Sequence, residues 1–187
     1  MLMNETLKVI SNRRSIRLFK DEQIKKEELD QIIEAGLYAP SANNSQAWHF
    51  TVIQSKEMIE RVNSWLLEEV EKSDNSRLKE IIARTGGKIF RNAHTIIIVS
   101  AANKDSYAAI NAAAATQTIL LAAESLGIGT CWIGTVRLLA ESTKLEQYVQ
   151  ELKIPEGYAP KNGITLGYKA ENPSLPERRQ NLVSHIF

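Results

Sequence analysis

The sequence predicts a single domain that combines helices and strands around a buried core. Three observations support this: the length of 187 residues, a hydrophobic content of 43%, and apolar residues that alternate between a helical period and short continuous runs. A chain of this length is normally one domain with a sizeable core. No internal repeat or low-complexity linker divides residues 1–187, so they are expected to form one unit.

The first half of the chain predicts two helices with a strand between them. Residues 27–37 place apolar side chains at helical spacing, and Pro40 follows the end of that helix. Residues 48–54 are rich in aromatic and β-branched side chains, which is typical of a strand. Ser55 is suited to cap the helix that follows, which presents apolar residues on one face over 58–66.

The second half continues the alternation. Residues 67–87 are charged and weakly periodic, so we expect exposed helix or a mobile flap, and 67–90 is the only candidate lid. Residues 95–101 form an apolar run without alternation, as in a strand covered on both faces. Short strands are predicted at 131–134 and 164–168, with an amphipathic helix over 145–152.

The most unusual predicted helix spans residues 103–127. Over 108–123 it is apolar nearly all round and rich in alanine, so it should be buried and show no solvent face. Either the rest of a monomeric core or a second subunit would cover it. The few polar interruptions of this stretch are Asn111, Thr116, Gln117 and Thr118.

Composition excludes several functional classes. A net charge of +1 argues against general nucleic-acid binding, which needs a strongly basic face. The single cysteine, Cys131, cannot form an internal disulfide, and no Cys/His cluster has metal-ligand spacing. No run of about 18 apolar residues is present to span a bilayer, and there is no secretory signal pattern. We therefore expect a cytoplasmic protein that binds neither membrane nor nucleic acid.

Two polar segments are candidates for ligand binding. In the run Arg13-Arg14-Ser15-Ile16-Arg17, alternate residues would face one side in extended backbone and offer guanidinium and hydroxyl donors to a phosphate. A basic patch at a helix C-terminus is the alternative. Residues 41–46 carry five amide or hydroxyl side chains, suited to the heteroatom edge of a flat ring, although polar turns have the same composition.

Two further segments are weaker signals. In Gly127-Ile128-Gly129-Thr130-Cys131-Trp132-Ile133-Gly134, the glycines permit close backbone approach, either to packed structure or to a flat ligand. This segment is no phosphate loop, because it lacks the lysine and hydroxyl ending. Arg178-Arg179 near the C-terminus is, taken alone, an ordinary solvated pair.

Together, these segments resemble the FMN-dependent nitroreductase family. Four stretches match its pattern in order and span nearly the whole chain: Arg-Arg-Ser-x-Arg-x-Phe at 13–19, Ala-Pro-Ser-x-x-x-x-Gln-x-Trp at 39–48, Leu-Gly-x-Gly-x-x-Trp-Ile-Gly at 126–134, and Leu-Gly-Tyr followed by a tail arginine. The resemblance implies an α+β fold with a central, mostly antiparallel sheet flanked by helices. It also implies an intertwined homodimer with two FMN sites at the subunit interface.

The resemblance also implies a role for individual residues. Arg13, Arg14 and Ser15 would hold the FMN phosphate and ribityl chain, and Arg17 would lie near flavin N1 and O2. Arg178 would meet the phosphate, with Arg179 as the alternative. The remaining cofactor-binding residues are those of the amide-rich loop, which would reach the partner's flavin, and those lining the ring: Pro40, Ser41, Asn44, Gln46, Trp132, Ile133 and Gly134.

The chain departs from the family pattern at three positions. Ala47 and His94 stand where proline is frequent, and we interpret His94 as structural. Ile133 stands where well-known members carry glutamate, so we expect details on the nicotinamide side to differ.

The activity that the resemblance implies is transfer of electrons from NAD(P)H, through bound FMN, to nitroaromatic, quinone or similar acceptors by a ping-pong mechanism. We assign no catalytic side chain. The alternatives are a substrate-specific member (dehalogenase, heterocycle dehydrogenase or flavin-degrading enzyme) and a non-catalytic flavin-binding protein.

Overall fold

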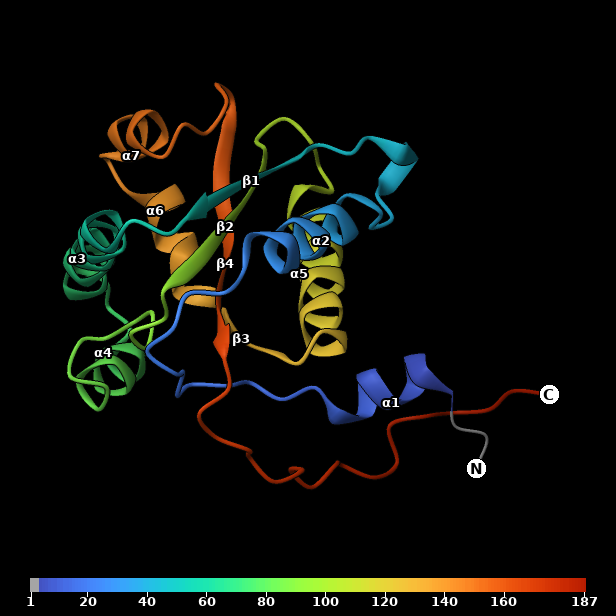
Figure 1. The fold of residues 1–187 in the computed structure, drawn as a ribbon. Helices are drawn as coiled ribbons and strands as arrows, with labels where there is room; N and C mark the ends of the chain where they lie inside the picture. The colour runs from blue at the N-terminus through green and yellow to red at the C-terminus, as the bar shows by residue number, and fades with distance from the viewer. Residues whose placement is uncertain (1–3) are drawn as a thin grey trace.

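The computed structural model describes residues 4–187 as an α+β fold built on a four-stranded sheet. Figure 1 shows the elements in order along the chain. They are α1 (Glu5–Asn12), α2 (Lys26–Leu37), the 3-10 turn η1 (Ala42–Asn44), β1 (Trp48–Ile53), α3 (Lys56–Lys72), α4 (Ser76–Ala83), β2 (Thr95–Ala102), α5 (Ala108–Ser125), β3 (Ile128–Ile133), the 3-10 turn η2 (Gly134–Arg137), α6 (Leu138–Glu141), α7 (Leu145–Glu151) and β4 (Tyr158–Tyr168).

The sheet is antiparallel, with strand order β1-β2-β4-β3. Its β3 edge is extended by the segment that follows α1, where Ser15 pairs with Thr130 in parallel. The backbone N–H of Ile16 donates to the Thr130 carbonyl at 2.8 Å. This contact aligns the arginine-rich N-terminal segment with β3.

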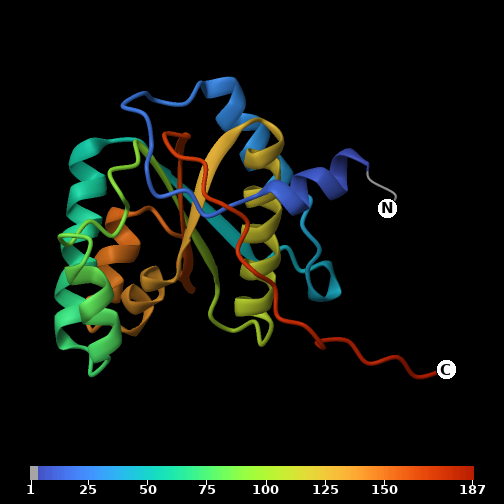
Figure 2. The same ribbon diagram turned by 90° about the horizontal axis from the view of Figure 1, so that it is seen from below.

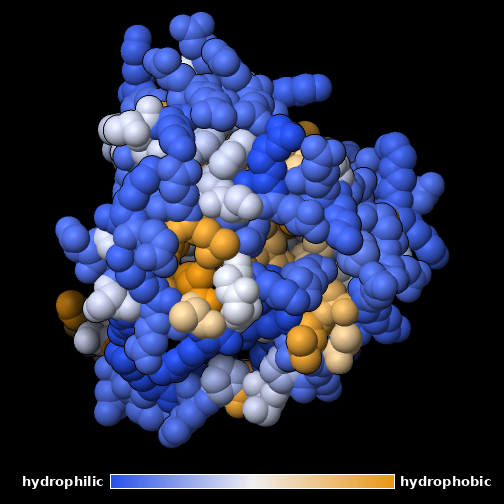
Figure 3. All heavy atoms as spheres, turned by 90° about the vertical axis from the view of Figure 1, so that its left-hand side faces the viewer, coloured by the Kyte–Doolittle hydropathy of each residue, from blue (hydrophilic) through white to orange (hydrophobic). Residues whose placement is uncertain are grey.

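Helices cover both faces of the sheet (Figures 1 and 2). On one face α3, α4, α6 and α7 enclose a core into which β2 sends Ile96 and Ile98. On the other face α2 and α5 pack against Ile97 and Val99. All four β2 side chains are fully buried, which confirms the prediction of a strand covered on both faces. The outer surface over α3, α4 and α7 is largely hydrophilic (Figure 3).

The prediction of exposed helix over 67–87 is confirmed, because the segment forms the end of α3 and the whole of α4 and most of residues 71–84 are exposed. Val70 and Ile82 are buried in the cluster beneath these helices, so the segment also contributes to the core. Its helical period is weak because apolar residues are sparse among the charges. A lid formed by 67–90 stays a prediction.

Two strands are longer than the sequence predicted. β4 begins at Tyr158, because Pro160 is accommodated opposite Ser100 by a shift of register between Val99 and Ser100. Proline normally interrupts strand pairing, and an irregularity of this kind is where it is tolerated. β3 begins at Ile128, upstream of the predicted start.

The expectation that α5 has no solvent face is wrong for the single chain. One side packs on the sheet and on α2, where Ala112, Ala115 and Ile119 are fully buried. The opposite side is uncovered, and Ile110 is 65% exposed. The helix α1 buries none of its residues. Within residues 4–187, no helix is long and apolar enough to cross a bilayer.

Candidate functional site

The N-terminal edge segment, residues 13–17 along β3, points its side chains alternately to two sides. Ile16 is buried toward the protein, whereas Arg13, Ser15 and Arg17 lie around Cys131 on the neighbouring strand. Burial raises the pKa of the Cys131 thiol, while the positive charges of Arg17, Arg91 and Arg13 favour the thiolate and oppose that rise. The thiol therefore stays neutral near pH 7, and these arginines gain no anionic partner from it.

Arg14 lies on the opposite side of the same segment. It lines a separate hollow of about 350 Å³ with Lys169 and Asn172. Its guanidinium donates to the carbonyls of Ser11 at 2.7 Å and Arg13 at 2.8 Å. The structure therefore does not bring Arg14 together with the other two arginines of the motif.

Backbone contacts hold the edge segment in place. The carboxylate of Glu171 accepts hydrogen bonds from the backbone N–H groups of Arg17 and Leu18, the latter at 3.1 Å. A Cβ at Gly129 would lie 3.0 Å from Cγ2 of Ile16, so this glycine permits close approach of packed structure. Gly134 differs, because a Cβ there would meet no atom within 4 Å. Of these two glycines, only Gly134 faces open space that a ligand can approach.

A chain of hydrogen bonds links Trp132 to α5. The indole N–H of Trp132 donates to Oδ1 of Asn162 at 3.2 Å, and the amide of Asn162 donates to Oγ1 of Thr116 at 3.2 Å. The Thr116 hydroxyl donates to the Ala112 carbonyl at 2.7 Å. Next to Trp132, the side chain of Ile133 is buried in the core, so only its backbone is open to a ligand.

The amide-rich loop is shaped by left-handed backbone at three positions. Asn43, Asn44 and Gln46 have φ of 53°, 51° and 47°, values that asparagine tolerates better than most residues. The Ser41 hydroxyl accepts from the Gln46 backbone N–H at 3.0 Å, which closes the turn. Most of the loop is exposed, including Pro40 at its start.

Asn111, which the sequence analysis noted only as an interruption of the apolar helix, anchors this loop to α5. Its Oδ1 accepts from the Ala42 backbone N–H at 2.9 Å, and its amide nitrogen donates to Asp105 at 2.8 Å and to Ser45 at 3.3 Å. The residue is 2% exposed. The sequence showed an amide in an otherwise apolar helix, but it did not show which residues that amide would contact.

Within one chain, the loop and the arginine segment lie at opposite ends of α5 (Figure 1). The loop is bound at Asn111, whereas the arginine segment and Glu124 line the same hollow. Thirteen residues of helix separate Asn111 from Glu124, about 20 Å at 1.5 Å per residue. The two candidate ligand-binding segments therefore do not meet within one protomer.

Arg178 and Arg179 are exposed in the C-terminal tail. Figures 1 and 2 both show the tail leaving the body of the protein. The geometry of one chain therefore does not connect either arginine to the Arg13 segment.

Sequence analysis missed Arg91, whose charge acts on Cys131 together with those of Arg17 and Arg13. Arg91 has φ of 57°, and its Nε is buried without a hydrogen-bond partner among residues 4–187. A single arginine in a charged stretch does not stand out by residue type or by its spacing from other residues, so the sequence did not mark Arg91 as a site residue.

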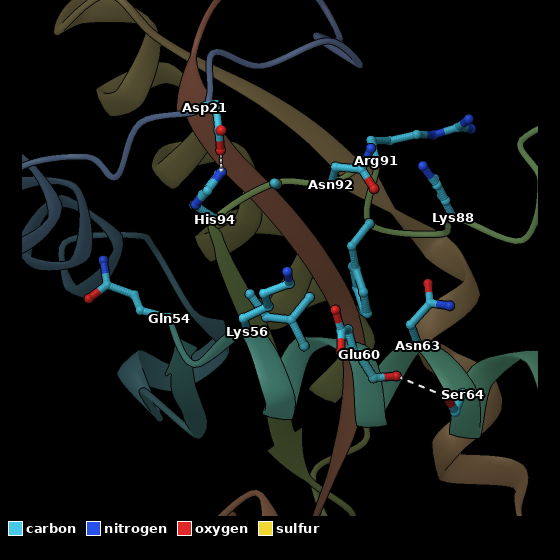
Figure 4. Close-up of a pocket in the computed structure, with 13 residues that line it drawn as sticks. Asp21, Gln54, Lys56, Glu60, Asn63, Ser64, Lys88, Arg91, Asn92 and His94 are labelled. Carbon is cyan, nitrogen blue, oxygen red and sulfur yellow. Dashed lines mark hydrogen bonds and ion pairs between the residues drawn. The ribbon is translucent and has the colours of Figure 1, made fainter.

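Arg91 also borders a cavity of about 590 Å³ between α3 and the segment preceding β2 (Figure 4). Nε2 of His94 lies 2.8 Å from Oδ1 of Asp21 there, and the structural interpretation of His94 stays a prediction. No group of three or more potential metal ligands occurs in the described part of the chain.

Comparison with known proteins identifies relatives over nearly the whole chain. The nitroreductase family model matches residues 10–168. A relative from Archaeoglobus fulgidus, which carries the names NADH dehydrogenase and NAD(P)H nitroreductase, is 33% identical over 94% of this chain and 91% of its own length. A Bacillus subtilis FMN reductase that uses NAD(P)H is 31% identical over 96% of this chain and 73% of its own length.

Solved structures agree with this assignment. A nitroreductase with bound FMN from Desulfitobacterium hafniense superimposes with a TM-score of 0.90 at 33% identity, covering 100% of both chains. A nitroreductase with bound FMN from Bacteroides fragilis gives a TM-score of 0.87 at 32% identity, covering 99% of this chain and 100% of its own. The fold described above, with its open antiparallel sheet, is therefore shared with both proteins.

We predict that Asn111→Ala lowers the free energy of unfolding by about 1–3 kcal/mol, because it leaves the Ala42 N–H and the Asp105 carboxylate without this partner. Urea denaturation measures the change. Gln31→Ala, which removes an exposed amide from α2, is the matched control and should change stability by less than about 0.5 kcal/mol. Equal stability of the two variants would contradict an anchoring role for Asn111.

Proposed function

This chain belongs to the nitroreductase family, and from that premise we propose that it is an FMN-dependent oxidoreductase that takes electrons from NAD(P)H and delivers them to electron-poor acceptors. The observation that carries the proposal is the cluster of Arg13, Ser15 and Arg17 beside β3, within a fold that matches two FMN-bound nitroreductases. Acceptors of this kind include nitroaromatics and quinones.

The donor groups present fit FMN. Arg13 and Ser15 offer charge-assisted and hydroxyl hydrogen bonds to a phosphate, and Arg17 offers a cation to the electron-rich edge of the ring. The buried, unpartnered Nε of Arg91 shows that this region has an unsatisfied donor. The open space at Gly134 admits a flat ring against the backbone of Trp132 to Gly134. FMN, when bound, supplies the redox chemistry, accepting electrons from the nicotinamide and passing them on.

We assign the protein residues to binding and orientation. Arg13, Ser15 and one tail arginine, Arg178 or Arg179, hold the phosphate end. Arg17 lies at the ring, where negative charge develops on reduction. Because Arg14 is directed to the other side of the segment, we give it the smaller role of supporting the backbone through its bonds to Ser11 and Arg13.

We propose that the protein is a homodimer and that each site is completed by the partner's amide-rich loop. In one protomer, Ser41, Asn44 and Gln46 lie about 20 Å along α5 from the arginine segment. A second copy can bring its own loop to that segment. The left-handed turns of the loop and its anchor at Asn111 leave the loop's polar groups facing outward, as a partner-facing site requires.

The uncovered apolar surface supports the same assembly. On α5 the uncovered side includes Ile110, Ala113 and Ala114, and α1 exposes Leu7 and Ile10. The C-terminal tail, which leaves the body of the protein (Figures 1 and 2), carries further exposed apolar side chains. They are Leu175, Leu182, Val183, Ile186 and Phe187. Apolar surface of this extent is normally covered by a partner.

We place the protein in the cytoplasm, in keeping with a single buried cysteine that forms no internal disulfide. The two alternative functions predict different results in an NAD(P)H oxidation assay. A non-catalytic flavin-binding protein would hold FMN but would not turn over NAD(P)H. A substrate-specific member would oxidise NAD(P)H slowly with quinones and quickly with its own acceptor.

We predict that Arg13→Ala weakens FMN binding by about ten- to a hundredfold, because one charge-assisted contact to the phosphate is lost. Titration of apo-protein with FMN and with riboflavin measures this, and riboflavin affinity should be unchanged. Arg84→Ala, on the exposed side of α4, is the control. A variant that binds both ligands equally poorly would remove Arg13 from the phosphate site.

We expect ping-pong kinetics, since donor and acceptor use the same flavin face in turn. Initial rates with varied NAD(P)H and a quinone should give parallel double-reciprocal lines. Intersecting lines would indicate a ternary complex and contradict a single shared binding position.

Ala114→Arg should weaken the dimer and release FMN with it, because a large charged side chain would enter the uncovered side of α5. Obligate homodimers bury about 2,000 Å² or more, so the unmodified protein should remain dimeric at micromolar concentrations. Sedimentation and flavin fluorescence on dilution measure both effects. Ala83→Arg, on the exposed surface of α4, is the matched control. A stable wild-type monomer with tightly bound FMN would be incompatible with shared sites.

A further inference from the structure

Arg91 and Asn92 lie between two buried residues. Phe90 on one side is 2% exposed and Ala93 on the other is 4% exposed. The backbone N–H of Ala93 donates to the Phe90 carbonyl at 2.9 Å, and that of Arg91 donates to the Lys88 carbonyl at 3.2 Å. Both Arg91 and Asn92 have φ of 57°, in the left-handed region. A non-glycine pair in this conformation is uncommon and persists where its surroundings enforce it.

The backbone of Arg91 is therefore constrained, yet one hydrogen-bond donor of its side chain has no acceptor in the described part of the chain. Nε is buried and has no hydrogen-bond partner within residues 4–187. Leaving a buried charged donor unpaired is costly, and buried polar groups almost always have a partner. Cys131, the nearby group on which this charge acts, is a neutral thiol and a weak acceptor. Within residues 4–187 this donor is therefore available to an acceptor from a bound ligand.

Arg91 lines the wall of the large cavity, but in Figure 4 its side chain extends away from Asp21 and His94 and from Gln54 and Lys56. Its charge acts on Cys131 together with those of Arg17 and Arg13. Cys131 directly precedes Trp132 in β3, and the backbone from Trp132 to Gly134 is the part of the chain proposed to line the ring. The phosphate-binding role is proposed for Arg13, so we place Arg91 with Arg17 at the ring.

We propose that Arg91 is a positioning residue for the flavin ring, donating hydrogen bonds to its pyrimidine edge beside Arg17. This inference rests on the function proposed above. Two guanidinium groups at this edge stabilise the negative charge of the reduced ring more than the neutral oxidised ring. Arg91 therefore sets the reduction potential of the bound cofactor in addition to its affinity.

The test compares Arg91→Gln with wild type in titrations of apo-protein with FMN and riboflavin, and in the midpoint potential of the bound FMN. We expect both ligands to bind about tenfold more weakly, by equal factors, because the ring is common to both. Reduced FMN should lose about tenfold more affinity than oxidised FMN, which lowers the two-electron potential by about 30 mV.

Two variants act as controls. Arg91→Lys keeps the charge without the planar fork, so it should retain most of the potential while losing part of the affinity. Arg84→Gln, on the exposed side of α4, should leave the affinities and the potential unchanged. Thermal unfolding of the apo-proteins shows whether each variant is folded.

The outcomes separate this inference from the proposed function. Wild-type protein that binds no FMN would overturn both. If wild type binds FMN but folded Arg91→Gln has unchanged affinities and potential, the inference alone fails. Loss of FMN affinity with unchanged riboflavin affinity would assign Arg91 to the phosphate and overturn the ring assignment.

Discussion

The packing of α5 against the sheet is the constraint on which the other parts of the structure depend. Its alanines let the helix lie close to the strands and to α2, so that Ala112, Ala115 and Ala123 have no exposed surface. The same helix carries two buried polar side chains, Asn111 and Thr116, at positions where neighbouring groups satisfy them. Asn111 holds the amide-rich loop, and Thr116 connects through Asn162 to Trp132. One apolar helix thus positions two of the candidate ligand-binding segments.

Charge is concentrated where the N-terminal segment joins β3. Arg13 and Arg17 act there with Arg91 on the neutral Cys131 thiol, and Glu171 bonds to the backbone instead of neutralising the guanidinium groups. Lys169 nearby is already paired with Glu124 at 2.8 Å. The pattern leaves cationic donors free for a ligand, although the net charge of the chain is only +1. Local arrangement, and not overall charge, therefore suits this protein to an anionic cofactor.

The positions of the two candidate segments at the two ends of α5 are the basis for the proposal that two chains share each site. The amide-rich loop is shaped and anchored at one end, and the arginine segment lies at the other. Between them, α5 carries Ile110 at 65% exposure and the partly exposed alanines Ala113 and Ala114. An assembly that covers this surface also brings unlike segments of two chains together. In the proposed dimer, burial of apolar area and completion of the site are a single event, which would couple cofactor binding to association.

Sequence alone determined the order of the main helices and strands, the buried β2 strand and the motifs that mark the family, because these depend on local periodicity and residue type. It also located the arginine segment and the amide-rich loop. The sequence did not indicate that the helices at 67–83 contribute to the core, because few of their residues are apolar and many are charged. The early start of β4 was missed because Pro160 is tolerated only by a register shift in its partner strand.

Tertiary structure decided which of the candidate residues share a site. The direction of Arg14 away from Arg13 and Arg17 depends on the pairing of the edge segment with β3, and the role of Asn111 depends on a loop nearly seventy positions earlier, which donates to it from Ala42. Arg91 joins the other arginines only through a left-handed turn held between two core residues. Such contacts join residues distant in the chain, and local pattern carries no information about them.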